Sequence, residues 1–306
     1  MRSKDRISTA VRLSNGEILV KNEPYRSLTT KFKVLGWPII RGAVSFIEML
    51  IIGIRTLNFS ADVAVKEVER QEAANKGVAY EEKKAKSNGI YLAGSALAAL
   101  GAGIFFFFFL PLWLAGLFGV SKEAVSFNLM AGAIRLTMFV AYVWGISFFS
   151  EFKRIFQYHG AEHKSIYAYE MGDELTPERA ACHTRFHPRC GTSFILIVAL
   201  FAILLYGVSD SLYAYFTGHA PALLTRFAVH FSLLPLVAGG SFELLKLSGR
   251  TRENAITRFL IQPGLWLQRI TTKEPSADQL EVAIAALEAS LGVSTSRITS
   301  KVTALS

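Results

Sequence analysis

The chain has 306 residues, of which 51% are hydrophobic and 19% charged, a composition too apolar for an ordinary soluble domain and too charged for membrane spans alone. The formal net charge of +9 could suit nucleic acid, but an excess of Lys and Arg beside apolar spans is typical of cytoplasmic loops that face anionic lipid, so we expect no nucleic-acid partner. The first residues are charged and lack the apolar run of a signal peptide, which argues against secretion.

The N-terminal region is expected to begin with a β-hairpin. Residues 7–22 contain two runs in which apolar and polar residues partly alternate. Between them lies Asn15-Gly16, a pair that tolerates the positive φ angles of a tight turn. The pattern therefore predicts two short antiparallel strands.

An amphipathic helix is predicted after the hairpin. Residues 35–59 are largely apolar, yet Arg41, Glu48 and Arg55 recur every seven residues and so share one helical face. Charges are costly at mid-bilayer, so this helix is expected to lie in the membrane interface or to pack against other spans. Residues 62–88 have the composition of a charged, solvated helical linker.

Four later stretches are apolar enough to cross a bilayer. Lys and Arg concentrate in the N-terminal region, the central loop and the tail, which places both termini and that loop in the cytoplasm. The sequence thus predicts a mainly α, polytopic membrane protein with about four transmembrane helices. The spans are expected at residues 89–119, 129–149, 191–206 and 222–245.

Five regions follow from this topology. The tail also contains a helix signal, because Ser276 and Gln279 form a plausible capping box and an apolar stripe follows at Leu280, Ile284, Leu287 and Leu291. The regions are 1–88 with the hairpin and membrane-associated helix, 89–149 with two spans, the cytoplasmic loop 150–190, 191–247 with two spans, and the cytoplasmic tail 248–306.

The central loop contains most of the histidines and both cysteines, which makes it the main functional signal. His159, Glu162 and His163 have the form H-x-x-E-H. On a continuous helix the i, i+4 spacing points both imidazoles toward one ion with a carboxylate alongside, an arrangement that can hold zinc. A short pattern of this kind also occurs by chance, in a loop that tolerates histidines well.

A third ligand would come from elsewhere in the chain. His187 and Cys190 are the nearest candidates by sequence, and Glu243 is a more distant one. The simpler interpretations are a small buried residue for Cys190 and a pair with Lys246 for Glu243. Arg189 could pair with acidic lipid or with a nearby glutamate.

The segments HGAEHKSIYAYE, HPRCGTSF and PGLWLQRITTKEP resemble the YqhQ-like family of bacterial membrane proteins, a domain of unknown function described as predicted metal-dependent enzymes. The resemblance extends over nearly the whole chain and implies a bacterial inner-membrane location. Family members usually begin with a Gly-Gly-Gln-Ala-Val-x-Glu-Gly-Val-Met stretch, and this chain starts at what looks like its last Met. By position, His159, Glu162, His163, Lys164, His187, Arg189 and Cys190 fall on the family's motifs, whereas Cys182 and His183 do not.

We therefore expect a metal-dependent, hydrolase-like enzyme at the cytoplasmic membrane face. His159 and His163 would bind a divalent metal, zinc before iron, with His187 or Cys190, while Glu162 acts as general base. The substrate could be a lipid head group or a peptide, and oligomers are compatible with this scheme.

Three other functions remain open. In a non-enzymatic scaffold or regulator, a structural metal or the His/Cys cluster itself would pin the loop to the bundle. A di-iron oxidase is weaker, because such enzymes display more histidines than this loop offers. Transport is also weaker, because the spans show few charges.

Overall fold

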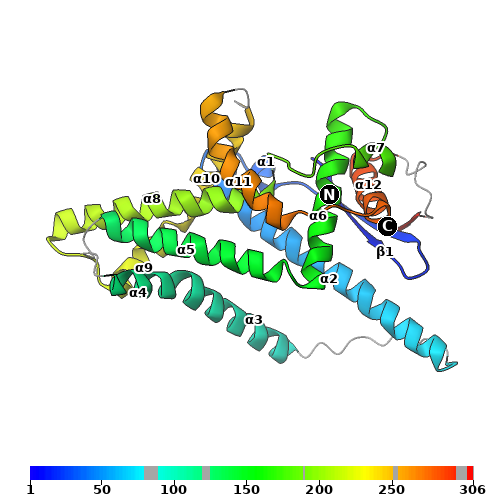
Figure 1. The fold of residues 1–306 in the computed structure, drawn as a ribbon, viewed down its shortest axis with the longest axis horizontal. Coiled ribbons are helices and arrows are strands. Elements are labelled where there is room, and N and C mark those ends of the chain that lie inside the picture. The colour runs from blue at the N-terminus through cyan, green and yellow to red at the C-terminus, as the bar shows by residue number, and fades with distance from the viewer. Residues whose placement is uncertain (79–88, 119–124, 189, 251–253, 294–301, 306) are drawn as a thin grey trace.

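The computed structural model describes residues 1–78, 89–118, 125–188, 190–250, 254–293 and 302–305, which are mainly helical (Figure 1). Long apolar helices form a bundle at one end of the molecule, and a small sheet packed with further helices forms the other end. Part of the predicted linker, part of the loop after the first predicted span, and Arg189 lie outside the described residues. The strands are β1 (Arg6–Arg12), β2 (Ile18–Pro24) and β3 (Val302–Leu305). The helices are α1 (Leu28–Lys31), α2 (Ile40–Asn75), α3 (Gly89–Ile104), α4 (Leu110–Leu117), α5 (Val125–Ile146), α6 (Ser150–Met171), α7 (Pro177–Ala181), α8 (Gly191–Thr217), α9 (Leu223–Ser232), α10 (Leu234–Arg250), α11 (Ala255–Thr271) and α12 (Ala277–Leu291), with a 3₁₀ turn at Val34–Gly36 and a π-helical turn at Phe105–Phe109.

The predicted hairpin is confirmed, with β1 and β2 antiparallel. Its turn is longer than expected: the Leu13 amide donates to the Glu17 carbonyl at 2.8 Å, and three residues lie between them. Within this turn only Gly16 has a positive φ, +86°, as in a three-residue turn that closes on a left-handed residue. The parallel strand β3 beside β2 was not predicted, because four residues carry little pattern.

Helix α12 is the core of the sheet-containing end. The predicted capping box is confirmed, and the Ser276 amide donates to Gln279 Oε1 at 3.0 Å. The helix packs against β1, β2, α6 and α7, so that Gln279 through Ser290 are buried all round and not along one stripe only. Arg12 on β1 pairs with Glu281 at 2.6 Å and fastens the hairpin to α12.

Three helices in the described part of the chain are long and apolar enough to cross a membrane: Leu97–Leu117, Val125–Ile146 and Phe194–Thr217. A fourth candidate is the pair Leu224–Ser232 and Leu234–Leu247, which is bent by 44°. Pro235 in the first turn of α10 explains the break, because proline lacks the amide hydrogen that would continue α9. The third predicted span ended too early, since α8 continues to Thr217.

Helix α2 continues to Asn75 and so includes much of the predicted linker. The three charges of its predicted polar face have separate surroundings. Arg41 forms a bidentate ion pair with Glu243 on α10, and Arg55 is exposed. Glu48 is buried and accepts hydrogen bonds from the Leu28 amide at 2.6 Å and the Tyr25 hydroxyl at 2.8 Å. Burial alone would raise the pKa of the Glu48 carboxyl, but these hydrogen bonds outweigh it and lower the pKa.

Candidate metal centre

Three side chains of the central loop meet in space. His159 and His163 lie one turn apart on α6, and Cys190 directly precedes α8. Their ligand atoms all lie within 4.8 Å of one another, and His159 Nε2 is 3.1 Å from Cys190 Sγ. His163 and Cys190 are buried and His159 is half-buried, so the group is largely shielded from water.

Each imidazole is held by a backbone carbonyl through its other nitrogen. His159 Nδ1 donates to the carbonyl of Thr271 at 2.8 Å, and His163 Nδ1 donates to that of Arg185 at 2.5 Å. Each Nδ1 therefore carries the proton, which leaves each Nε2 as the atom that can bind a ligand. Metal-binding histidines are held in the same way by such outer hydrogen bonds.

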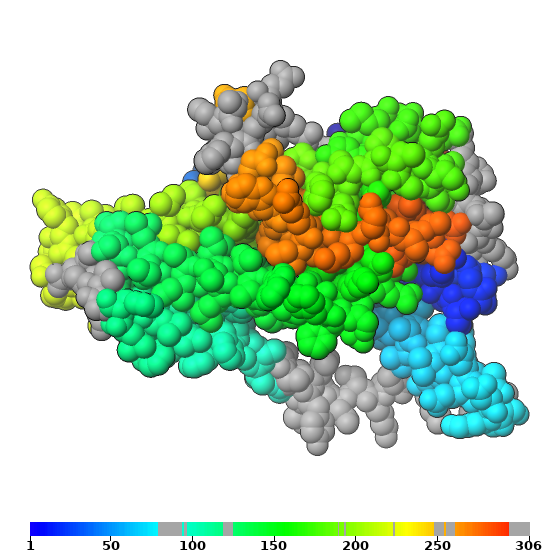
Figure 2. Space-filling model, in the orientation of Figure 1, coloured from blue at the N-terminus to red at the C-terminus, as the bar shows by residue number. Residues whose placement is uncertain are grey.

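Gly160 makes this arrangement possible. A Cβ atom at Gly160 would lie 2.1 Å from the carbonyl oxygen of Lys273, so only glycine lets the segment after α11 cross α6 here. The Lys273 amide donates to the Phe156 carbonyl at 2.8 Å, and this crossing brings the Thr271 carbonyl to His159. Figure 2 shows this segment, in orange, lying across the green surface of α6.

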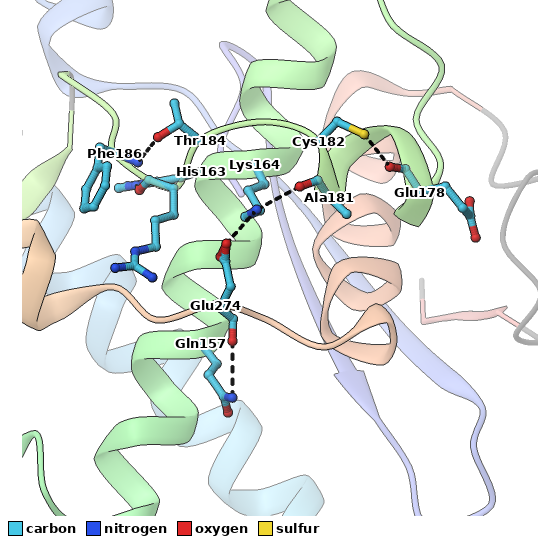
Figure 3. Close-up of polar contacts among 10 residues, drawn as sticks. Gln157, His163, Lys164, Glu178, Ala181, Cys182, Thr184, Phe186 and Glu274 are labelled. Atoms are coloured by element: carbon cyan, nitrogen blue, oxygen red, sulfur yellow. Dashed lines mark hydrogen bonds and ion pairs between the residues drawn. The ribbon is translucent and has the colours of Figure 1, made fainter.

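Lys164, a buried residue of α6, also holds the segment after α11 against this helix. Its ammonium group is buried and donates to the Ala181 carbonyl at 2.9 Å and to Glu274 Oε1 at 3.1 Å, as Figure 3 shows. Gln157 donates to the Glu274 carbonyl at 3.3 Å. Lys164 thus links α6, the end of α7 and the segment after α11. Neither of these partners is one of the three clustered side chains.

Cys190 has the environment of a thiolate. Burial alone would raise its pKa, but hydrogen bonds from His159 and His163 and their positive charge lower the pKa to about 5. Its Sγ also accepts the Thr192 amide at the start of α8, where the helix dipole favours negative charge. Burial alone would lower the pKa of His159, but the bond to Cys190 raises it. The Cys190 sulfur therefore accepts a hydrogen bond from the His159 imidazole, and a metal ion could take the place of the proton between them.

His187 lies beside the group but outside it. Its peptide is held by Gln268, whose Oε1 accepts the His187 amide at 2.7 Å and whose Nε2 donates to the His187 carbonyl at 2.8 Å. The ring lies 4.8 Å from the ring of Tyr167, and His187 Nε2 is 3.7 Å from Glu170 Oε2. The ring centroids of His163 and His187 are 5.7 Å apart, so His187 packs behind the three ligand atoms.

The other candidate residues are more dispersed. Glu162 is exposed on α6, and its charge contributes to the raised pKa of His159. Glu243 pairs with Arg41 and does not reach the cluster. Cys182 is exposed, with Sγ 3.3 Å from the Glu178 carbonyl (Figure 3), and His183 pairs with Asp173 at 2.7 Å.

The residues that hold the cluster were missed by sequence reasoning. Thr271 and Arg185 act through their backbone carbonyls. Every residue type has such a carbonyl, so the side chains at these positions give no signal in the sequence. Gln268 lies within the motif PGLWLQRITTKEP, but glutamine is not one of the usual zinc ligands. Gly160, inside H-G-A-E-H, is the residue whose type could have indicated that another segment crosses α6 closely at this point.

Comparison with known proteins gives one family. The family described as "Protein of unknown function (DUF1385)" matches residues 37–293, a range that includes all three clustered side chains. "Uncharacterized protein YqhQ" from Bacillus subtilis (strain 168) is 33% identical over 287 residues, which cover 90% of this chain and 84% of that protein. No solved structure shows a significant match.

Proposed function

We propose that this chain, which belongs to the DUF1385 family, is a bacterial inner-membrane protein that holds one zinc ion between His159, His163 and Cys190 and acts as a hydrolase. The observation that carries the proposal is the pair of Nδ1 hydrogen bonds, which aims both Nε2 atoms at one thiolate. Zinc would supply Lewis-acid activation of water at this site.

The donor set fits zinc better than the harder ions. Two imidazoles and a thiolate are ligands that Zn²⁺ binds readily, whereas Mg²⁺ and Ca²⁺ prefer oxygen; iron is the second choice. Three protein ligands leave one tetrahedral position for a substrate or water, which is typical of catalytic zinc sites. A structural site usually has a fourth protein ligand, and His187 packs behind the group instead of completing it.

The position of the centre along α8 supports a membrane-surface site. Because β3 pairs with β2, the hairpin and the C-terminal strand lie on one side of any membrane, which requires an even number of crossings. In the proposed topology, the bent pair α9 and α10 forms the fourth crossing after the three straight candidates. The excess of Lys and Arg favours a cytoplasmic hairpin side, and in the proposed topology Cys190, at the start of α8, lies at the cytoplasmic surface.

The substrate class follows from this position. A lipid head group or a peptide at the cytoplasmic face would reach the centre without crossing the bilayer. Helix α2 carries exposed apolar side chains that suit the interface, among them Ile47, Leu50, Ile51 and Ile54. Glu162 is the exposed carboxylate nearest His163 in the chain and is our candidate for the general base.

Metal analysis tests the centre. Full-length protein purified in detergent should contain about one zinc per chain by mass spectrometry, as a single three-ligand site requires. The double variant His159→Ala, His163→Ala should contain essentially none, while His183→Ala, which changes a histidine outside the cluster, should match wild type. Metal-free wild type that also fails to take up added zinc contradicts the proposal.

A second candidate function is that of a non-enzymatic scaffold in which the metal has a structural role. The cluster joins α6 to the start of α8 and, through the two carbonyls, to the end of α11 and the segment before α8, so a buried ion there would fasten four segments together.

Glu162→Gln separates the two candidates. In an enzyme this variant keeps zinc and fold but loses cellular function in a complementation assay, because the proton acceptor is gone. In a scaffold it keeps all three, and only ligand substitutions are harmful. Glu178→Gln, an exposed acid on α7, is the matched control and should complement in either case.

A further inference from the structure

A second polar cluster lies among the apolar helices. Asp210 on α8 faces Arg226 and His230 on α9, and all three side chains are at most 5% exposed. Asp210 Oδ2 is 2.7 Å from Arg226 Nε, and Asp210 Oδ1 is 2.9 Å from His230 Nε2. Both carboxylate oxygens are therefore already engaged. The third predicted span ended before Asp210, so the sequence did not place this residue within a span.

A second guanidinium lies beside this cluster. Arg135 on α5 has its guanidinium 5.5 Å from the centre of the Phe108 ring. Among the described residues no carboxylate forms an ion pair with Arg135, and its buried Nε has no hydrogen-bond partner. The local balance is one carboxylate against two guanidinium groups, and an uncompensated charge is costly in apolar surroundings.

Both residues that carry these unpaired atoms, Arg135 and His230, line one small cavity. A space of about 10 Å³, the room needed by one water-sized particle, is lined by Arg135, His230, Tyr206 and Asn128 within an otherwise apolar wall. His230 is 2% exposed, and its buried Nδ1 has no hydrogen-bond partner. No carboxylate lines the cavity, whereas guanidinium, phenol and amide groups all offer hydrogen-bond donors.

We propose that this cavity is a binding site for one small monovalent anion, of which chloride is the natural probe. A halide supplies the missing negative charge for Arg135 and accepts hydrogen bonds from Tyr206 and Asn128. When the His230 ring is protonated, both of its nitrogens are donors, so Nδ1 can serve the anion while Nε2 stays on Asp210. Phosphate, sulfate and carboxylate ligands are too large for this cavity, and a cation would meet no carboxylate among its lining residues.

The neighbouring helix break supports a ligand site. The chain is bent by 44° between α9, which carries Arg226 and His230, and α10. Interrupted helices at membrane depth are typical of places where ions or substrates bind, because the break leaves backbone polar groups without their helical partners. The inference concerns the apolar bundle and does not depend on the zinc centre.

Equilibrium binding of radioactive ³⁶Cl⁻ to full-length protein in detergent micelles, with gluconate as the background anion, tests the site. Wild type should bind about one chloride per chain in a saturable manner, competed by bromide and not by sulfate. Arg135→Gln should abolish binding, and Arg154→Gln, which alters an exposed arginine on α6, should leave it unchanged. Because Arg135→Gln could also disturb folding, Tyr206→Phe provides a second variant that removes one donor and keeps the ring.

The expected result for Tyr206→Phe is a Kd raised roughly tenfold, the usual effect of losing one hydrogen bond to a charged group. Size-exclusion chromatography of each variant establishes that it is folded. Absence of saturable ³⁶Cl⁻ binding by folded wild type overturns the proposal and leaves water as the occupant. Equal binding by wild type and both cavity variants overturns it as well, since the chloride then lies elsewhere.

Discussion

Replacing Cys190 by serine is expected to lower the affinity of the purified protein for zinc by about a thousandfold, more than the 10–100-fold typical of losing an outer hydrogen-bonding partner. The thiolate supplies the negative charge of the site, and its pKa of about 5 keeps it deprotonated at neutral pH without metal. Serine keeps the size but not the anionic, polarisable sulfur. Zinc affinity is measured by competition with a chelator of known affinity.

Cys182 provides a matched control within the same loop. It is exposed, and its sulfur lies against the backbone carbonyl of Glu178 in the first turn of α7. Cys182→Ser should therefore leave zinc affinity within about twofold of wild type, since surface substitutions away from a site have small effects. If both serine variants bind zinc like wild type, the thiolate is not a ligand and the centre as drawn is wrong.

Gly160→Ala is expected to cost about 3 kcal/mol of stability or more, at the upper end for overpacking in a closed site. The new methyl group would lie 2.1 Å from a backbone oxygen of Lys273, which cannot rotate away as a side chain could. Relief requires the segment after α11 to leave α6, and with it the Thr271 carbonyl that orients His159. Zinc affinity should fall together with the thermal unfolding temperature.

Gly53→Ala is the control for the same chemical change. Gly53 lies inside α2, and an added Cβ there meets no atom within 4 Å. Alanine favours helix over glycine by about 0.5–1 kcal/mol, so this variant should unfold at the same temperature as wild type or slightly higher. An unchanged unfolding temperature for Gly160→Ala would show that the crossing of α6 is not closed as described.

The sequence predicted well the features that depend on neighbouring residues, and it predicted only in part the contacts between residues that are distant in the chain. The hairpin and the capping box follow from nearest neighbours in the chain and were confirmed. The spacing of His159 and His163 predicted that they share a helical face, as they do. The sequence could not indicate whether His187 or Cys190 lies beside these two histidines. The position of His187 depends on Gln268, which is distant in the sequence and holds the His187 peptide.

Burial and buried charge were harder to predict for the same reason. The partners that cover α12 come from the beginning and the middle of the chain, so its apolar stripe alone could not indicate that the whole helix is buried. Asp210 went unnoticed because a polar stretch near the end of an apolar run looks like the end of a span. Its partners Arg226 and His230 belong to the next helix and meet it only after folding.

The joining of β3 to the N-terminal hairpin has a consequence for biosynthesis. At about 5–20 residues per second, the ribosome releases the last strand and α12 on the order of tens of seconds after the hairpin has emerged. During that interval β2 has an open edge, and the apolar faces that α12 will cover are exposed. The sheet-containing end can therefore close only after every intervening helix has been made.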